Sequence, residues 1–171
     1  QSYAITAVLQ GTLVALYGGV MLVFLAVHNV VAWWQLTSAN YVEHYGLLRR
    51  RATAEGQHAG GTGYEAPQPH HSWNTNHLVT NLATFHLQRH SDHHAHPMRR
   101  YQSLRHFDDL PQLPSGYFGM FPLAYVPPLW FAVMDKRLLA LPQVQGDLGR
   151  VNVCPRRRQA LLQRHGQARA G

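Results

Sequence analysis

The histidines are the residues of this chain best suited to chemistry, because they are numerous and closely spaced. The chain holds 13 histidines among 171 residues, and the tightest group is His90, His93 and His94. Side chains at i, i+3 and i+4 share one face of a helix, so a helix would aim these three imidazoles at one point. Imidazole is the commonest metal-binding side chain. The spacing predicts a transition-metal site, and three ligands on one helix leave open positions that suit catalysis.

The helix that carries this trio can be delimited from the sequence. Ser72 is a suitable N-cap, and Pro97 disfavours helical geometry in the residue before it, so we expect the helix to end there. At about 100° per residue, His86 shares an arc of about 100° with the trio, whereas His77 lies opposite. For His86, ligation and a role beside the ligands both stay open. Asp92 points away from the arc, so we expect it to orient ligands or to lie at the surface.

The identity of the metal is only partly limited by composition. The chain has one cysteine, which excludes a thiolate cage or an iron–sulfur cluster built from this chain. Imidazole suits zinc, copper, nickel and iron alike, so residue chemistry leaves the choice open. The other histidines near the trio have no helical register with it, and structural or surface roles are expected for them: His70, His71, His96 and His106.

The N-terminal part of the chain has the composition of a membrane segment. Residues 3–36 contain no Asp, Glu, Lys or Arg, and about 20 apolar residues suffice to cross a bilayer. Gly18-Gly19 interrupts this run, so we expect two membrane helices, about 3–17 and 20–45, joined by a tight turn. One long tilted helix is the alternative. The polar His28 and Asn29 inside the second helix should face another helix rather than lipid.

Aromatic and basic residues after this run indicate how the chain is oriented. Trp33 and Trp34 suit a membrane interface, and Arg49–Arg51 follow, which favours the cytoplasmic side for this end and for the histidines beyond it. The formal net charge of +7 is explained by that location. Anionic lipid is therefore the expected partner, and nucleic acid is not. We predict an all-α integral membrane protein in the inner membrane, with a cytoplasmic histidine-rich helical region.

Composition divides the chain into four parts. Residues 1–47 hold the membrane helices, and the glycine-rich residues 48–72 are predicted to form a flexible loop. Residues 73–137 hold the histidine region and an apolar stretch, 118–133, whose prolines prevent a continuous spanning helix. That stretch should lie against the membrane surface or pack on the core. Residues 138–171 form a basic, polar tail with the composition of a disordered segment.

Two motifs carry a resemblance to a known family. The strings NYVEHYG at 40–46 and LQRHSDHHA at 87–95 resemble signature boxes of the membrane-bound alkane 1-monooxygenases. Residues 71–74, 99–106 and 113–117 are also similar to that family, and order and spacing are preserved across roughly 20–137. The resemblance implies a helical membrane enzyme with a di-iron centre. It would insert one oxygen atom from O2 into the terminal carbon of an n-alkane, with electrons from NADH delivered through rubredoxin.

The same resemblance implies roles for individual residues. His44, His90, His93 and His94 would be iron ligands, and Asn40, one helical turn before His44, would steady its ring. Glu43 is adjacent to His44 and is expected to point elsewhere, as a surface carboxylate or one that orients a ligand.

The chain also departs from the family pattern. The family's two earlier histidine boxes are absent, so the chain resembles the C-terminal part of the enzyme. Four ligands are too few for two irons, and we expect the isolated chain to be inactive. Two alternatives stay open. One is another membrane histidine-box oxygenase or desaturase acting on an apolar substrate, and the other is a non-catalytic membrane metal-binding module.

Overall fold

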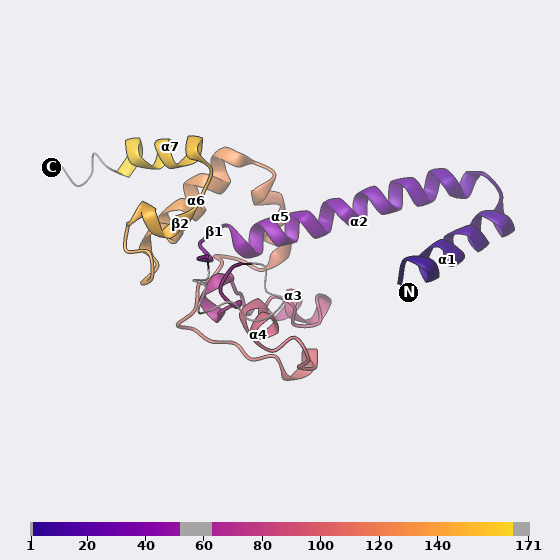
Figure 1. The fold of residues 1–171 in the computed structure, drawn as a ribbon, viewed down its shortest axis with the longest axis horizontal. Coiled ribbons are helices and arrows are strands. Elements are labelled where there is room, and N and C mark those ends of the chain that lie inside the picture. The colour runs from indigo at the N-terminus through magenta and orange to yellow at the C-terminus, as the bar shows by residue number, and fades with distance from the viewer. Residues whose placement is uncertain (1, 52–62, 166–171) are drawn as a thin grey trace. The chain divides into compact units, whose positions relative to one another are not determined.

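The computed structural model describes residues 2–51 and 63–165, which are mostly helical (Figure 1). The chain divides into two units, residues 1–39 and 40–171. The longer elements are α1 (Ser2–Tyr17), α2 (Val20–His44), α3 (Leu78–Ala83), α4 (His90–Ala95), α5 (Tyr117–Ala124), α6 (Pro127–Ala140) and α7 (Pro155–His165). Two short strands, β1 (Gly46–Leu47) and β2 (Val151–Asn152), pair antiparallel. Single 3-10 turns are η2 (Pro69–His71), η3 (Tyr101–Ser103) and η4 (Leu148–Arg150).

The first unit holds α1 and most of α2, within one residue of the two predicted helices. Gly18 has a φ of +78°, a conformation open to glycine, and it turns the chain between them, which rules out one long helix. Asn29 Oδ1 accepts a hydrogen bond of 3.3 Å from Gln10 Nε2, so Asn29 does face another helix. Within the described residues, α2 alone is long and apolar enough to cross a membrane. The 16 residues of α1 fall short of the roughly 20 that a span needs.

The second unit is organised around an apolar core that collects the end of α2, α5 and α6. Its fully buried side chains include Val42, Trp73, Tyr117, Met120, Trp130, Met134 and Leu138. The apolar stretch at 118–133 is broken, as predicted, because α5 ends before Tyr125 and Pro127 and Pro128 open α6. The buried face of α6 packs on the core.

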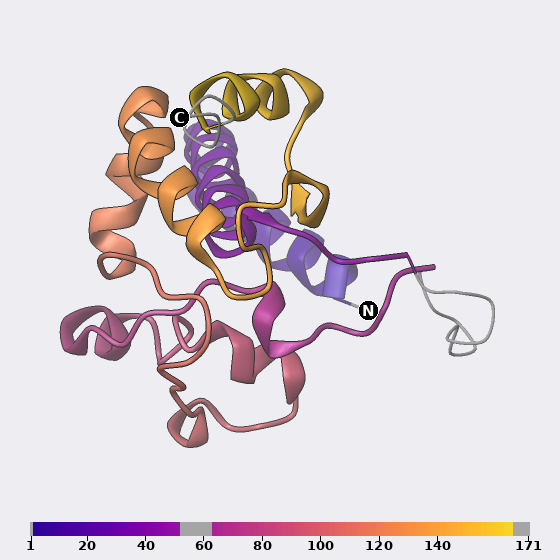
Figure 2. The ribbon, with the colours of Figure 1, turned by 90° about the vertical axis from the view of Figure 1, so that its left-hand side faces the viewer.

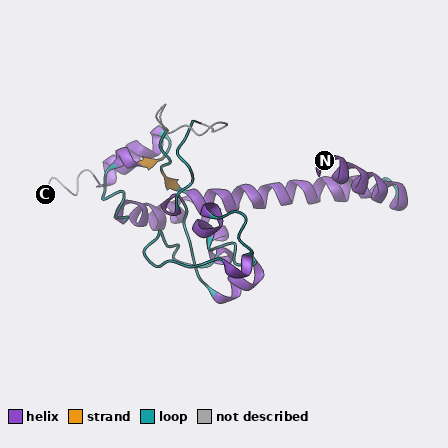
Figure 3. Cartoon of the chain, turned by 60° about the horizontal axis from the view of Figure 1, so that its bottom comes forward, coloured by secondary structure: helices purple, strands orange, loops and turns teal. Residues whose placement is uncertain are grey.

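The predicted single helix over 72–97 is wrong. The chain instead forms two six-residue helices, α3 and α4, joined by turns and surrounded by loop (Figure 3). The break lies at Phe85 and His86, whose φ angles are +51° and +59°. Thr80 and Asn81 bond through their side chains to nearby polar groups, and such bonds compete with helix propagation. Ser72 is buried and caps neither helix, while the end of α4 before Pro97 agrees with the prediction.

The tail is more ordered than its composition suggests. The described residues beyond 137 complete α6 and form η4, β2 and α7 (Figure 2). Asp135 holds α7 in place, because its carboxylate ion-pairs with Arg157 and accepts a hydrogen bond of 2.6 Å from the Tyr45 hydroxyl. The Arg157 guanidinium also lies 3.7 Å above the centre of the Phe131 ring. Residues 52–62 of the predicted flexible loop, 48–72, lie outside the described residues. Its described part includes an antiparallel bridge between Arg51 and Tyr64 and the turn η2.

A test of this packing is Gly46→Ala, which places a Cβ where the chain leaves α2. Gly46 has a φ of +72°, and a Cβ there would overlap the Leu138 side chain. We expect the free energy of unfolding to fall by about 1–3 kcal/mol from strain and overpacking. Urea unfolding in detergent, followed by tryptophan fluorescence, measures it. Gly149→Ala is the control, because its Cβ would meet only the exposed Asp147 carboxylate. Equal losses in the two variants would contradict this account of Gly46.

Candidate metal centre

Three imidazoles from two separate elements converge in the second unit. His44 is the last residue of α2, and His90 and His94 lie one turn apart on α4. The Nε2 atom of His90 is 2.8 Å from Nε2 of His94 and 3.3 Å from Nε2 of His44. Ligand nitrogens of all three lie within 4.8 Å of one another, and no other group of this kind occurs among residues 2–51 and 63–165. The ring centre of His44 is 5.1 Å from those of His90 and His94, well inside the reach of a shared metal site.

These separations are those of ligands around one cation. Two ligand atoms with metal bonds of about 2.1 Å, at a right angle to each other, lie about 3.0 Å apart. The protonation of His44 agrees with this reading. Its Nδ1 is 2.9 Å from the carbonyl oxygen of His71, which can only accept, so Nδ1 carries the proton and Nε2 presents its lone pair to the cluster. The residues therefore fit a metal ion.

Burial lowers the pKa values of two of the three histidines. Burial lowers the pKa of His90 to about 2, with further contributions from His94, His44 and His93. Burial, with His44 and His93, likewise lowers the pKa of His94 to about 4. Both rings are therefore neutral near pH 7, and neutral imidazole is the form that binds metal.

Glu43 joins the cluster, contrary to the expectation that it would point elsewhere. Its side chain is buried, and Oε2 lies 3.2 Å from His90 Nε2. Oε1 accepts a hydrogen bond of 2.7 Å from the Tyr117 hydroxyl. Burial raises the pKa of Tyr117 well above its usual value, so the hydroxyl stays a donor. Residue spacing along α2 separates Glu43 from its neighbour His44, and it cannot show that the ring of His90 contacts both residues.

The position of α4 depends on polar contacts with preceding and following loops. Asn74 bonds both to the Ser91 backbone N–H, at 2.9 Å, and to the Ser91 hydroxyl, at 2.6 Å. Asp92 is buried, so the surface position expected as one alternative is wrong. Its carboxylate binds Arg99 and the Arg105 backbone N–H. Burial opposes ionisation of Asp92, but these donors outweigh it and hold its pKa below the usual value. Asp92 thus fastens the loop after α4 to that helix.

The remaining predicted residues are placed differently. The ring centre of His93 lies 5.9 Å from that of His90 and 5.8 Å from that of His94, beside the three converging nitrogens. His86 belongs to the turn before α4, and its ring centre lies 6.4 Å from that of Tyr101. Asn40 is exposed, and the contact expected of it is made by the His71 carbonyl. No local pattern in the sequence marks that carbonyl.

Comparison with known proteins places these residues in a family. Residues 2–124, which include the whole cluster, match the fatty acid desaturase family. The chain is 49% identical, over its full length, to an alkane 1-monooxygenase of Ectopseudomonas oleovorans and covers 40% of that relative. It is 49% identical over 97% of its length to alkane 1-monooxygenase 1 of Alcanivorax borkumensis, covering 39% of it.

A more distant relative is the hydroxylase component of xylene/toluene monooxygenase from Pseudomonas putida. The identity is 31% over 80% of this chain, which covers 33% of that relative. The chain therefore spans about 40% or less of the length of these three relatives. Since the family match extends over most of the sequence and contains every residue of the cluster, the chain belongs to the fatty acid desaturase family.

Proposed function

We propose that this chain forms the C-terminal part of a membrane-bound alkane 1-monooxygenase, which hydroxylates the terminal carbon of n-alkanes with O2. The observation that carries the proposal is the convergence of His44, His90 and His94, whose nitrogens are spaced as ligands of one metal ion. The similarity to alkane 1-monooxygenases over nearly the whole chain supports the choice of substrate.

Iron is the metal we propose. His44, His90 and His94 would hold it, with His93 beside them and with Glu43 close enough to His90 to add a carboxylate oxygen. Mixed imidazole and carboxylate donors are typical of non-haem iron sites. When bound, iron supplies the redox change that oxidation of a C–H bond by O2 requires, which zinc lacks. A pair of irons needs more donors than these residues provide, so further ligands would come from the rest of the enzyme.

The chain's other residues suit an enzyme that takes its substrate from a membrane. We propose that α2 crosses the inner membrane and that the shorter α1 also crosses it, with the bilayer thinned locally around α1, so that the protein is multi-pass. Arg49–Arg51 soon after α2 favour a cytoplasmic location for the histidine cluster. The insoluble alkane would enter from the bilayer. Electrons would come from rubredoxin, as the similarity to alkane 1-monooxygenases implies. The single cysteine of this chain cannot itself form a rubredoxin site.

A second substrate class is favoured by one observation. A similar segment, 31% identical, occurs in a relative named for xylene and toluene. Product analysis with octane and with xylene separates the two classes. A non-catalytic metal-binding module would bind metal and oxidise neither substrate.

His90→Ala, made in the complete enzyme that carries this segment, tests the ligand assignment. Because His90 lies between the other two imidazoles, we expect iron affinity to fall by at least about 100-fold and octane hydroxylation with rubredoxin to be lost. Iron per chain and 1-octanol formation are measured together. His77→Ala, which alters an exposed histidine, is the control and should retain both. Unchanged iron content and activity in His90→Ala would refute the ligand assignment.

Glu43→Gln keeps the shape of the side chain and removes its acidic group. Burial raises the pKa of Glu43 to about 7, and a bound cation would favour the ionised form. We expect iron affinity to fall by about 10–100-fold, because a buried carboxylate beside neutral imidazoles favours a cation. Tyr117→Phe is the matched variant, since it removes only the hydrogen bond to Glu43 and should weaken binding less. Calorimetric titration of the complete enzyme with iron measures the affinity of each variant. If Glu43→Gln binds as tightly as the unaltered protein, Glu43 has no part in the site.

A further inference from the structure

Helix α3 exposes its apolar side chains and buries its polar ones. Leu78, Val79 and Leu82 are 72%, 69% and 66% exposed, whereas Thr80 and Asn81 are each 4% exposed. A helix on the surface of a soluble domain normally turns its apolar side to the core. The reversed arrangement marks a surface that contacts something other than water.

Hydrogen bonds hold α3 in this orientation. The Thr80 hydroxyl donates to Gln88 Oε1 at 2.6 Å, and Gln88 Nε2 donates to the His77 carbonyl at 2.8 Å. Asn81 Nδ2 donates to Asn76 Oδ1 at 2.7 Å. Rotating α3 to bury its leucines would break these buried bonds, which is costly. The apolar side is therefore presented outward by the fold itself.

Neighbouring segments extend this surface. A groove of about 420 Å³ runs between α3 and the start of α5, where Phe118 is 55% exposed. At the other end of α3, the exposed Phe85 ring packs edge-on against Tyr101, with ring centres 5.2 Å apart. We call Leu78, Val79, Leu82, Phe85 and Phe118 the α3 face.

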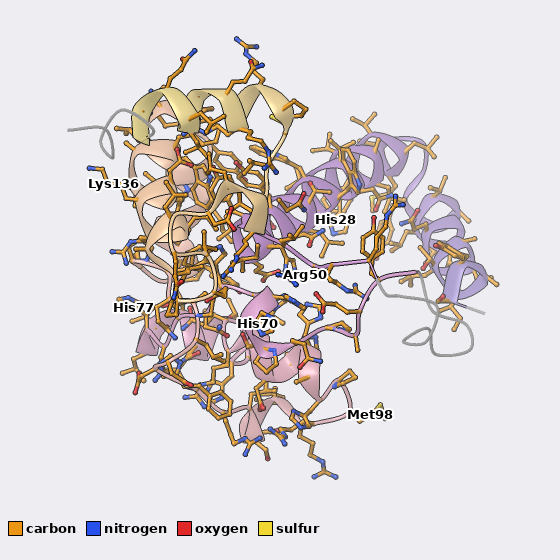
Figure 4. The ribbon with its side chains drawn as sticks, turned by 60° about the vertical axis from the view of Figure 1, so that its left-hand side comes forward. His28, Arg50, His70, His77, Met98 and Lys136 are labelled. Atoms are coloured by element: carbon orange, nitrogen blue, oxygen red, sulfur yellow. The ribbon has the colours of Figure 1, made fainter. Side chains whose placement is uncertain are left out.

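The absence of charged residues in the segments that form the α3 face indicates what kind of partner it contacts. Residues 66–88 and 117–134, which supply all of it, contain no Asp, Glu, Lys or Arg. Tyr101, whose ring packs against Phe85, is preceded in sequence by the exposed Arg100. Met98, two residues before Arg100, is 94% exposed and is labelled in Figure 4. An uncharged apolar surface with an exposed arginine next to Tyr101 complements the acyl chains and anionic headgroups of a membrane. The membrane-capable α2 of the same chain would also keep the face near a bilayer, which raises its effective concentration there.

We propose that the α3 face lies in the interfacial layer of an anionic lipid membrane, as a contact additional to α2. The face enters to the depth of the boundary between headgroups and acyl chains, and Arg100 meets lipid phosphates. This contact requires neither iron nor the alkane substrate, so it can be tested separately from the proposed activity.

The test uses the single cysteine of the chain. The whole chain is reconstituted in nanodiscs of phosphatidylcholine and phosphatidylglycerol, and a nitrobenzoxadiazole label is attached at Leu82→Cys in a Cys154→Ser background. The matched control carries the label on native Cys154, which is exposed just before α7. Figures 1 and 2 both draw α7 apart from α3. Phe118→Cys provides a second labelled position on the face, and circular dichroism verifies that each variant is folded.

Lipids brominated at different depths give the readout. We expect the labels at 82 and 118 to emit at shorter wavelength than the label at 154 and to be quenched most by bromines nearest the glycerol, because interfacial helices bury their apolar side about 5–10 Å deep. Labels at 82 and 118 that emit as in water, or that are quenched no more than the label at 154, would overturn the proposal. A blue-shifted but unquenched label would also overturn it, because the face would then be covered by protein.

Discussion

The candidate site depends on how the end of α2 is joined to the segment that follows η2. The last carbonyls of a helix have no partner within it. Trp73 satisfies two carbonyls in this region. Its backbone N–H donates to the Glu43 carbonyl oxygen and its indole N–H donates to the Tyr45 carbonyl oxygen, each at 2.8 Å. The His71 carbonyl accepts from His44 Nδ1 in return. One junction thus completes the helix end, sets the tautomer of His44 and brings the next segment alongside.

From this junction the other parts of the site follow in order. Trp73 is succeeded by Asn74, whose amide binds Ser91 and so places α4 against the end of α2. Asp92 then ties the loop after α4 back to that helix. A buried polar network of this kind is stable only when its members are bonded, and it then specifies one arrangement. That makes the cluster a preorganised arrangement, in which the three imidazoles already face one another.

Much of this arrangement could be predicted from the sequence, and the failures have physical causes. The absence of charge and the Gly18-Gly19 pair were sufficient for the two N-terminal helices. The spacing of His90 and His94 predicted a shared face, which α4 provides. The longer helix was missed because periodicity cannot show that Phe85 and His86 adopt left-handed backbone. The roles of Glu43 and of the His71 carbonyl arise from contacts across 47 and 27 positions in sequence, which helical spacing does not encode.

The central claim is that His44, from the end of α2, and His90 and His94, from α4, bind one iron ion through Nε2. X-ray absorption of the Fe(II)-loaded chain, compared with its His44→Ala variant, tests this most directly. The account predicts nitrogen neighbours at about 2.0–2.2 Å, with the outer scattering typical of imidazole rings, and loss of one ring in the variant. A first shell of oxygen atoms alone, or imidazole scattering that is unchanged by His44→Ala, would contradict it.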